Sequence, residues 1–588
     1  MNAYWPEGMP SSLDYPDLPA GGLLTAAAKL YGDRIAVVDG EEQFSFAQLY
    51  ERATAFAHGL RRAGVHDGDV VLLHLPNSVW FLVGYYGALL AGAAVAPTNP
   101  LQPAAGLRAQ LHDTGAVVAV SHPAHVSPLL DVRAGSALRT IVVVPPSAAA
   151  PSAEHPPADE AVVALEDFVA DRLDGPPTST VTSTDVAHIV YTGGTTGIAK
   201  GVRVLHRNVI ANVTQMTAWR AAHLVIQEED GGLRLEPIRG VYDAPVEPGN
   251  AVTVLVSPLF HVHGLINVNF LLLCGTTVIL TGRFSPERLL TSIERHSATY
   301  LLGSPTMWHA LVDSPQVHER NLSSVRAISS GGAPIDKATL RSLEAAFPAA
   351  MVGEGYGLTE GTCLVTSTPL LRGTERRLGS VGLPVFDTQV EIRPFAGGDD
   401  LSERDEVGEL WVRGPQVTAG YLNQPEATAE QFVDGWLRTG DLGYRDEDGF
   451  VFISGRAKEM LIYKGYNVYP RELEDVLHSH PDVRSAAVVG RPDARVGQEP
   501  IAFVVPRPGA AFDPEEVMAY VAERVLPYKK LRAVHVVETL PVSAAGKILK
   551  SALAARFATP GGEAEPSARG AASPQAEGEG PACPQTSG

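Results

Sequence analysis

The sequence predicts an α/β protein with a second, smaller α+β unit at its carboxyl end. Between residues 187 and 357, short apolar runs alternate with helical patterns, as in a sheet covered by helices. After Gly455 the pattern becomes more compact, and 588 residues are too many for one core. We therefore expect a large domain over 1–456, a small domain over 457–556 and a disordered tail over 557–588, where almost every residue is small or polar.

The large domain contains clear strand and helix patterns. Strands are expected at residues 251–256, 277–280, 299–302 and 325–329. Ser285 as N-cap, Pro286 in the first turn and the following Glu287 indicate the start of a helix. Residues 78–97 are almost long enough to cross a bilayer, but their glycines and the missing basic flanks favour a buried helix.

Two stretches are expected to be surface excursions. Residues 145–185 are rich in Pro, Ala and Ser and contain at most one short helix near 163–173. Residues 223–250 contain few core positions and look inserted between two elements of the sheet region. In the small domain, helices are expected at 470–480 and from Asp513-Pro514, and strands at 486–489 and 501–505.

Composition excludes several classes of protein. The 46 basic and 66 acidic side chains give a net charge of −20, which argues against nucleic-acid binding. The three cysteines, Cys274, Cys363 and Cys583, match neither a disulfide framework nor a metal site and fit a reducing compartment. No signal peptide is visible in residues 1–18. A cytoplasmic protein without membrane insertion is therefore expected.

The most informative stretch is residues 191–201, Tyr-Thr-Gly-Gly-Thr-Thr-Gly-Ile-Ala-Lys-Gly, directly behind an apolar strand-like run. Glycines allow backbone N–H groups to converge on an anion, the threonines add donors, and Lys200 adds a positive charge. A P-loop is excluded because Gly-Lys-Ser/Thr is absent; an ordinary surface turn is the alternative. The predicted triphosphate-binding residues are Thr192, Gly193, Gly194, Thr195, Thr196, Gly197 and Lys200.

Four further motifs follow in order: residues 353–361 with Thr359 and Glu360, 437–443 with Asp441, 454–458 with Arg456, and 541–547 with Lys547. At these separations the motifs resemble the adenylate-forming superfamily of acyl-CoA synthetases, adenylation domains and beetle luciferases. The resemblance covers roughly residues 30–550, and 191–200 and 464–477 are most similar to long-chain fatty acyl-CoA ligases. Gly193 replaces a frequent serine and Ala199 a frequent proline, as also occurs in fatty acyl ligases.

This resemblance implies a fold and a reaction. The fold would be a large domain of helix-covered sheets with a small barrel-like subdomain, followed by a small mobile α+β domain. The reaction would use ATP and Mg²⁺ to adenylate a hydrophobic carboxylic acid, and then transfer the acyl group to the thiol of coenzyme A. Positive charge is needed because both the carboxylate and the triphosphate are anionic.

The resemblance also implies roles for single residues. Thr359 would contact the α-phosphate, Glu360 would hold Mg²⁺, and Asp441 would bind the ribose hydroxyls with Arg456 nearby. Lys547 would bridge the attacking carboxylate and the nucleotide. The adenine would lie among Gly331, Gly332, Ala333, Pro334, Tyr356 and Gly357. Taken singly, Asp441 could cap a turn, Glu360 and Lys547 could be solvated charges, and Arg456 could be a structural ion-pair partner.

The acyl and thiol sites are less specified. His261 resembles the family's gate to the acyl pocket, whereas the role of His263 stays open. Residues 257–270 contain no carboxylate that could pair with an α-ammonium group, so an apolar acid is expected rather than an amino acid. Lys458 matches the family's hinge, and the surface near Gly465 would form part of a pantetheine tunnel.

Several alternatives remain at this level. The adenylate could pass to a carrier protein or a separate transferase, the scaffold could catalyse a luciferase-like oxidation, or the chain could be a non-catalytic sensor. The sequence leaves open whether the acid is fatty, cyclic or polycyclic, what residues 223–250 do, and whether the protein forms a homodimer.

Overall fold

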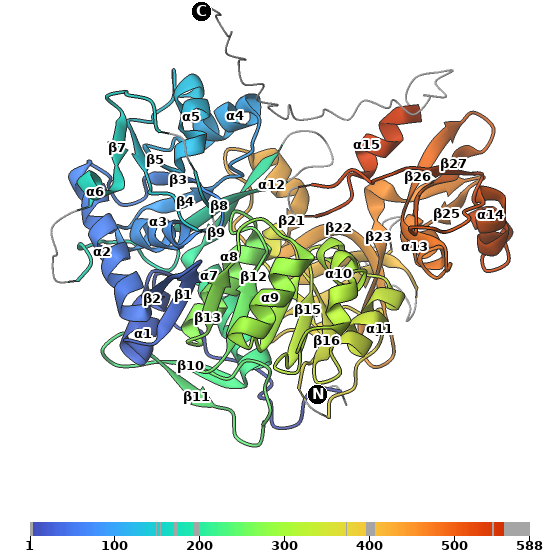
Figure 1. Ribbon diagram of the computed structural model, residues 1–588, viewed down its shortest axis with the longest axis horizontal. Coiled ribbons are helices and arrows are strands. Elements are labelled where there is room, and N and C mark those ends of the chain that lie inside the picture. Colours follow the sequence, from blue (N-terminus) through green and yellow to red (C-terminus); the bar gives the residue numbers. More distant parts are fainter. Residues whose placement is uncertain are drawn as a thin grey trace, which may run out of the picture.

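The structure is a computed structural model that describes residues 4–148, 150–152, 155–169, 175–192, 199–371, 373–394, 406–543 and 546–557 (Figure 1). The predicted tail after residue 557 lies outside this part, as do Gly193, Gly194, Thr195, Thr196 and Gly197.

Two large sheets form the body of the protein. The first has nine strands in the order β18-β17-β16-β15-β14-β12-β13-β1-β2. Its strands are β1 (Ile35–Asp39), β2 (Glu42–Ser45), β12 (Val252–Leu255), β13 (Thr277–Leu280), β14 (Tyr300–Gly303), β15 (Ala327–Ser330), β16 (Met351–Tyr356), β17 (Thr366–Ser367) and β18 (Leu383–Pro384). The middle of this sheet, from β1 through β13, β12, β14 and β15 to β16, is parallel. The four strands predicted from apolar runs are therefore confirmed to within two residues at each end.

The second sheet has seven strands in the order β7-β6-β5-β3-β4-β8-β9. They are β3 (Val70–His74), β4 (Ala94–Pro97), β5 (Val118–Ser121), β6 (Thr140–Val143), β7 (Val162–Ala164), β8 (Val186–Thr192) and β9 (Lys200–Leu205). All pairs are parallel except β8 with β9, which are antiparallel and flank the glycine-rich loop.

Helices cover both sheets. They are α1 (Gly22–Tyr31), α2 (Phe46–Arg62), α3 (Val79–Leu90), α4 (Ala104–Thr114), α5 (Val126–Val132), α6 (Leu165–Phe168), α7 (His206–Ala221), α8 (Val262–Leu273), α9 (Pro286–His296), α10 (Pro305–Val312) and α11 (Lys337–Ala346). The largest core joins the two sheets through α2, α3, α7 and α8. Two further cores lie under α9–α11 and under α4–α5. The predicted α/β architecture is confirmed.

Local sequence explains the helix boundaries and the close packing. Ser285 caps α9 by accepting a hydrogen bond from the backbone N–H of Arg288, as predicted. Gly87 lets α3 approach α2, because a Cβ there would lie 2.8 Å from the carbonyl oxygen of Ala53. The buried helix predicted for residues 78–97 is only partly correct, since the chain turns after α3 and residues 94–97 form β4. No helix of the described chain is long and apolar enough to span a membrane.

The two predicted excursions contain more structure than expected. Residues 223–250 include an antiparallel hairpin of β10 (His223–Gln227) and β11 (Leu233–Pro237), whose Val225 and Leu233 are buried in the main core. The hairpin itself was not predicted, because alternation over only five residues is a weak signal beside prolines and glycines. In residues 145–185, β7 and the short α6 occupy part of the region expected to be one helix.

A third sheet follows the nine-stranded sheet, in the place expected for the barrel-like subdomain. Its five antiparallel strands are β19 (Gln389–Arg393), β20 (Gly408–Arg413), β21 (Phe432–Val433), β22 (Trp436–Arg445) and β23 (Val451–Arg456), and α12 (Pro425–Gln431) precedes β21. The side chains of these strands share a core with Val365 and Val381.

The carboxyl-terminal part has its own sheet and core, drawn in orange and red in Figure 1. Its elements are β24 (Leu461–Tyr463), β25 (Tyr466–Val468), α13 (Pro470–His478), β26 (Val483–Asp493), β27 (Gly497–Pro506), α14 (Pro514–Ala522), β28 (Ala533–Val536) and α15 (Lys550–Ala554). We call this part the lid. The predicted helices at 470–480 and after Asp513 are confirmed, while the two predicted strands are longer than expected.

Candidate active site

The predicted adenine-binding residues lie at the carboxyl ends of two neighbouring parallel strands. Residues 331–334 follow β15, and Tyr356 is the last residue of β16. Ligands of parallel α/β sheets bind at this edge. Gly357 must be glycine, because a Cβ there would lie 1.4 Å from the carbonyl oxygen of Cys363. The structure thus brings Gly331, Gly332, Ala333, Pro334, Tyr356 and Gly357 to one edge.

Asp441 and Arg456 form a cross-strand pair beside this edge. They face each other in the β22–β23 ladder, and Arg456 Nε lies 3.1 Å from Asp441 Oδ1. The hydroxyl of Tyr356 donates to Asp441 Oδ2 at 2.7 Å. The carboxylate is only 4% exposed and raises the pKa of Arg456 above its usual range. Asp441 is therefore held rigidly, with lone pairs left to accept further hydrogen bonds.

Tyr421 links the glycine-rich loop to the segment containing Thr359 and Glu360. Its hydroxyl donates to Glu360 Oε1 at 2.7 Å, and Lys200 Nζ lies 4.6 Å from the centre of its ring. Thr192 pairs with Lys200 across the β8–β9 ladder, so the two ends of the loop are fixed together. The five loop residues between them that were predicted to bind triphosphate lie outside the described chain.

Tyr421 was not singled out from the sequence. It forms a β-bridge with Val202 of β9, and the neighbouring N–H of Leu422 donates to the carbonyl oxygen of Gly201 at 2.7 Å. An isolated tyrosine in a loop shows no periodicity that would assign it to this place.

Lys547 reaches the same site from the lid. Burial lowers its pKa and the charge of Arg456 lowers it further, whereas the nearby carboxylates Glu459 and Asp441 act in the opposite direction. His261, the N-cap residue of α8, is close enough to Lys547 that the lysine charge adds to the effect of burial in lowering the histidine pKa. Lys547 therefore lies within electrostatic range of Asp441, Arg456 and His261.

The loop that carries Lys547 rests on the amino end of α10. The hydroxyl of Thr306 donates to the carbonyl oxygen of Gly546, and a Cβ on Gly546 would lie 2.9 Å from Ser304 Oγ. Gly546 also has φ = +79°, which favours glycine. This contact fixes the backbone next to the lysine.

A second contact between the lid and the body is ionic. Asp313, just after α10, lies 3.0 Å from Arg484 and 3.6 Å from Arg507 of the lid. The rings of His309 and His478 stack beside it with centroids 5.8 Å apart. These groups line a cavity of about 140 Å³ between the two parts. We call this cluster the latch.

Lys458 and Gly465 do not join the cluster around Lys547. Lys458 is exposed in a single 3₁₀ turn, Ala457–Glu459, between β23 of the body and β24 of the lid. Gly465 is exposed in the tight turn between β24 and β25, where φ is +51° at Lys464 and +82° at Gly465. The roles of Lys458 as a hinge and of the surface near Gly465 as part of a pantetheine tunnel stay predictions.

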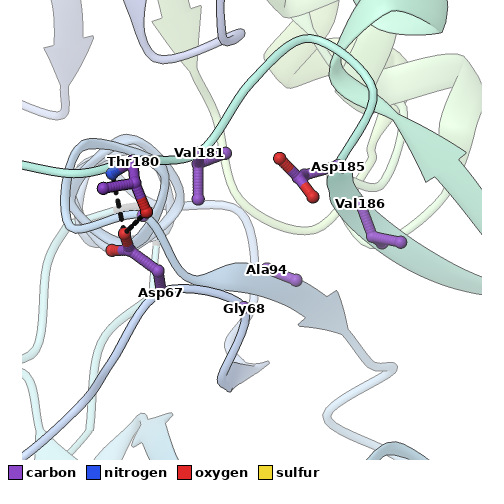
Figure 2. A pocket seen from close by; sticks show the side chains of 8 residues that line it. Asp67, Gly68, Ala94, Thr180, Val181, Asp185 and Val186 are labelled. Atoms are coloured by element: carbon purple, nitrogen blue, oxygen red, sulfur yellow. Dashed lines mark hydrogen bonds between the residues drawn. The ribbon is translucent and has the colours of Figure 1, made fainter.

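A larger cavity of about 340 Å³ lies at the amino ends of β4 and β8 in the seven-stranded sheet (Figure 2). This edge is opposite to the carboxyl end of β8, where the glycine-rich loop begins. Its Asp67 accepts two hydrogen bonds from Thr180, both at 2.7 Å, and pairs with Arg61. Its Asp185 accepts hydrogen bonds from Thr182. Because these carboxylates hold the chain in place at the amino ends of the strands, we do not assign a reaction to this cavity.

Comparison with known proteins defines the class to which this fold and site correspond. Residues 24–422 match the AMP-binding enzyme family, and residues 472–547 match the AMP-binding enzyme C-terminal domain. The chain therefore belongs to the AMP-binding enzyme family and is an adenylate-forming enzyme.

Particular relatives narrow the comparison. A long-chain-fatty-acid–CoA ligase from Bacillus subtilis is 33% identical over 94% of this chain and 97% of its own, and a 4-coumarate–CoA ligase from Narcissus pseudonarcissus is 33% identical over 90% and 92%. Among solved structures, ATP-bound MatB from Rhodopseudomonas palustris superimposes with a TM-score of 0.78 at 28% identity, covering 92% of this chain and 99% of that one. A benzoate CoA ligase from Burkholderia xenovorans has a TM-score of 0.76 at 26% identity, covering 91% and 99%.

Proposed function

We propose that this protein is an AMP-forming acid–CoA ligase. It converts a carboxylic acid with a largely apolar body and ATP into acyl-AMP and pyrophosphate, and then transfers the acyl group to the thiol of coenzyme A. The observation that supports this proposal is that Lys547 of the lid lies within electrostatic range of the Asp441–Arg456 pair of the third sheet and of His261 of the body.

In the first half-reaction the acid's carboxylate attacks the α-phosphorus of ATP and pyrophosphate leaves. Asp441, fixed by Arg456 and Tyr356, accepts hydrogen bonds from the ribose hydroxyls and so sets the position of the nucleotide. Lys547 lies between the two anions, where its charge offsets their repulsion and stabilises the transition state. Thr359 donates to the α-phosphate, and Lys200 faces the departing pyrophosphate.

Glu360 is suited to hold Mg²⁺. One carboxylate oxygen accepts from Tyr421, which leaves the other for a cation. Among the described residues no group of three or more His, Cys, Asp or Glu side chains could bind a metal by itself. A single carboxylate fits, because Mg²⁺ keeps several waters and completes its octahedron with phosphate oxygens. When bound, the ion would neutralise charge on the triphosphate.

In the second half-reaction the CoA thiol attacks the acyl carbon and AMP leaves. Lys458 lies on the connection between β23 and β24, so rotation there would withdraw Lys547 and turn the Gly465 hairpin toward the site. The hairpin's Ile462 and Tyr466 are 50% and 57% exposed, and Tyr466 stacks on Tyr528 at 4.6 Å. An exposed apolar patch of this kind suits a surface that docks in a second arrangement.

The test is acid-dependent ATP–pyrophosphate exchange followed by acyl-CoA detection. We expect exchange with Mg²⁺ and an apolar acid, and acyl-CoA when coenzyme A is added. Absence of exchange with every acid in a broad panel, from a folded protein that binds ATP, would refute the proposal. Exchange without acyl-CoA, rescued by a carrier protein or a second enzyme, would instead establish that the adenylate is passed to another acceptor. Light emission with oxygen uptake would indicate a luciferase-like oxidoreductase.

A further inference from the structure

A buried arginine lies close to the acyl end of the proposed site. Arg220 is in the last turn of α7 and is 2% exposed. Its Nη1 donates to Oδ1 of Asn267 at 2.8 Å, while its Nε is buried without a hydrogen-bond partner. Because α7 is buried along nearly its whole length, the guanidinium is enclosed by the main core instead of reaching solvent.

Contacts connect this arginine to the active-site edge. A Cβ on Gly355, in β16, would lie 3.8 Å from Arg220 Nη2. Asn267 donates to the carbonyl oxygen of His263 at 2.8 Å, and a Cβ on Gly331 would lie 2.9 Å from His263 Nε2. Arg220, Asn267 and His263 thus form a polar line from the core to the ends of β15 and β16, where the nucleotide is expected.

The structure provides no counter-charge for Arg220 within the described chain. No aspartate or glutamate of that part forms an ion pair with it, and its neighbours are neutral. Burial raises the pKa of the Cys363 thiol to about 12, and burial with the charges of His261 and Arg220 lowers the pKa of His263 to about 3. Buried charges are normally paired, because loss of hydration is costly.

We propose that Arg220 binds a second carboxylate at the far end of the acid, so that the preferred substrates are dicarboxylic acids. Asn267 occupies Nη1 and leaves Nε and Nη2 unbonded within the described chain. A guanidinium presents such N–H groups as a planar fork that matches the two oxygens of a carboxylate. The first carboxylate then reacts beside Lys547 and the second is held by Arg220. This inference rests on the proposed function and specifies its substrate class.

The test compares acids that differ only at the far end: an α,ω-dicarboxylic acid, its monomethyl ester and the monocarboxylic acid of equal length. ATP–pyrophosphate exchange gives kcat/KM for each across a series of chain lengths. We expect the best diacid to exceed its ester and monoacid by roughly 10- to 100-fold, the range for a charge-assisted interaction. In Arg220→Met this preference should disappear while exchange with the monoacid persists. Arg220→Lys should keep part of it, since the charge remains without the fork.

Arg62→Met is the matched control. Arg62 also donates to a single neutral oxygen, the carbonyl of Phe168 at 2.7 Å, but it lies at the end of α2, outside the site. The control should retain the wild-type preference. Thermal denaturation with ATP establishes that each variant is folded.

The outcomes separate this inference from the proposed function. Wild-type enzyme that activates monoacids or esters as well as diacids overturns the inference and leaves the ligase assignment intact, and this comparison needs no variant. A wild-type kcat/KM that is equal for the diacid and for its monomethyl ester, whose far end is a neutral acceptor, also overturns the inference. If no acid supports exchange, the proposed function fails, and equilibrium binding decides about Arg220: diacid that does not stabilise the wild type more than Arg220→Met also overturns the inference.

Discussion

Removal of the Lys547 amine should separate the two half-reactions. In Lys547→Ala the lid contact through Gly546 remains, because it uses the backbone carbonyl and the Thr306 hydroxyl. What is lost is one positive charge, half-buried beside Asp441 and Arg456. Two unit charges 4 Å apart interact by about 4 kcal/mol at an effective dielectric constant of 20, and one positioned transition-state donor contributes about 2.7–4 kcal/mol. Adenylation should therefore slow by roughly 10²- to 10³-fold.

The assay measures each half-reaction separately. Single-turnover formation of acyl-AMP reports the first, and thioester formation from supplied acyl-AMP and coenzyme A reports the second. The second rate should change by less than about threefold, well under 1 kcal/mol. Lys29→Ala, which removes an exposed lysine paired with Glu228 and Asp230, is the control and should leave both rates unchanged. Equal loss of both half-reactions in Lys547→Ala would refute the assignment of this lysine to adenylation alone.

Three further predictions concern the stability of the fold, the latch and the hinge. Burial raises the pKa of Glu354 from 4.5 to about 7, so the unfolded chain loses this proton first and stability falls as pH rises between those values. Glu354→Gln should therefore be more stable than wild type at pH 8 by up to roughly 3 kcal/mol, with no advantage at pH 4; urea denaturation that shows no pH-dependent difference would contradict this. Asp313→Asn removes two latch ion pairs and should slow adenylation up to about fivefold, less at high salt, without slowing thioester formation; a salt-independent rate would argue against the latch. Lys458→Pro should spare adenylation but impair thiol transfer by stiffening the hinge, and unchanged transfer would exclude that role.

The predictable parts of the fold were those with strong local patterns. β13 was predicted correctly from a short apolar run, and α9 from the Ser-Pro-Glu sequence at its start. Each of these signals lies within a few consecutive residues. The hairpin of β10 and β11 was missed because its burial against the core depends on tertiary packing. Residues 94–97 were misassigned because an apolar run does not distinguish a helix from a buried parallel strand.

The residues of the candidate site also fall into two groups, those that sequence motifs predict and those that only tertiary contacts reveal. Asp441, Lys547 and the two glycine-rich turns could be predicted as site residues because motifs in a fixed order are visible in a single chain, and their roles stay predictions. Tyr421 and Arg220 were not, since their importance comes only from what they touch. Arg220 in particular has the sequence context of an ordinary basic residue in the last turn of a helix, which is usually solvated. The expectation of an apolar acid considered residues 257–270, and α7 lies outside that stretch.

Tyr421 contacts two charged groups at once: its hydroxyl donates to the carboxylate of Glu360, and the ammonium group of Lys200 lies over the face of its ring. Such a position is useful spectroscopically: a fluorine atom introduced next to the phenol oxygen would sense proton donation to Glu360 and the approach of the lysine ammonium together. A nucleotide that changes either of these two contacts would then shift a single ¹⁹F resonance. A single labelled tyrosine would thus report whether the positions of Glu360 and Lys200 change when a nucleotide binds.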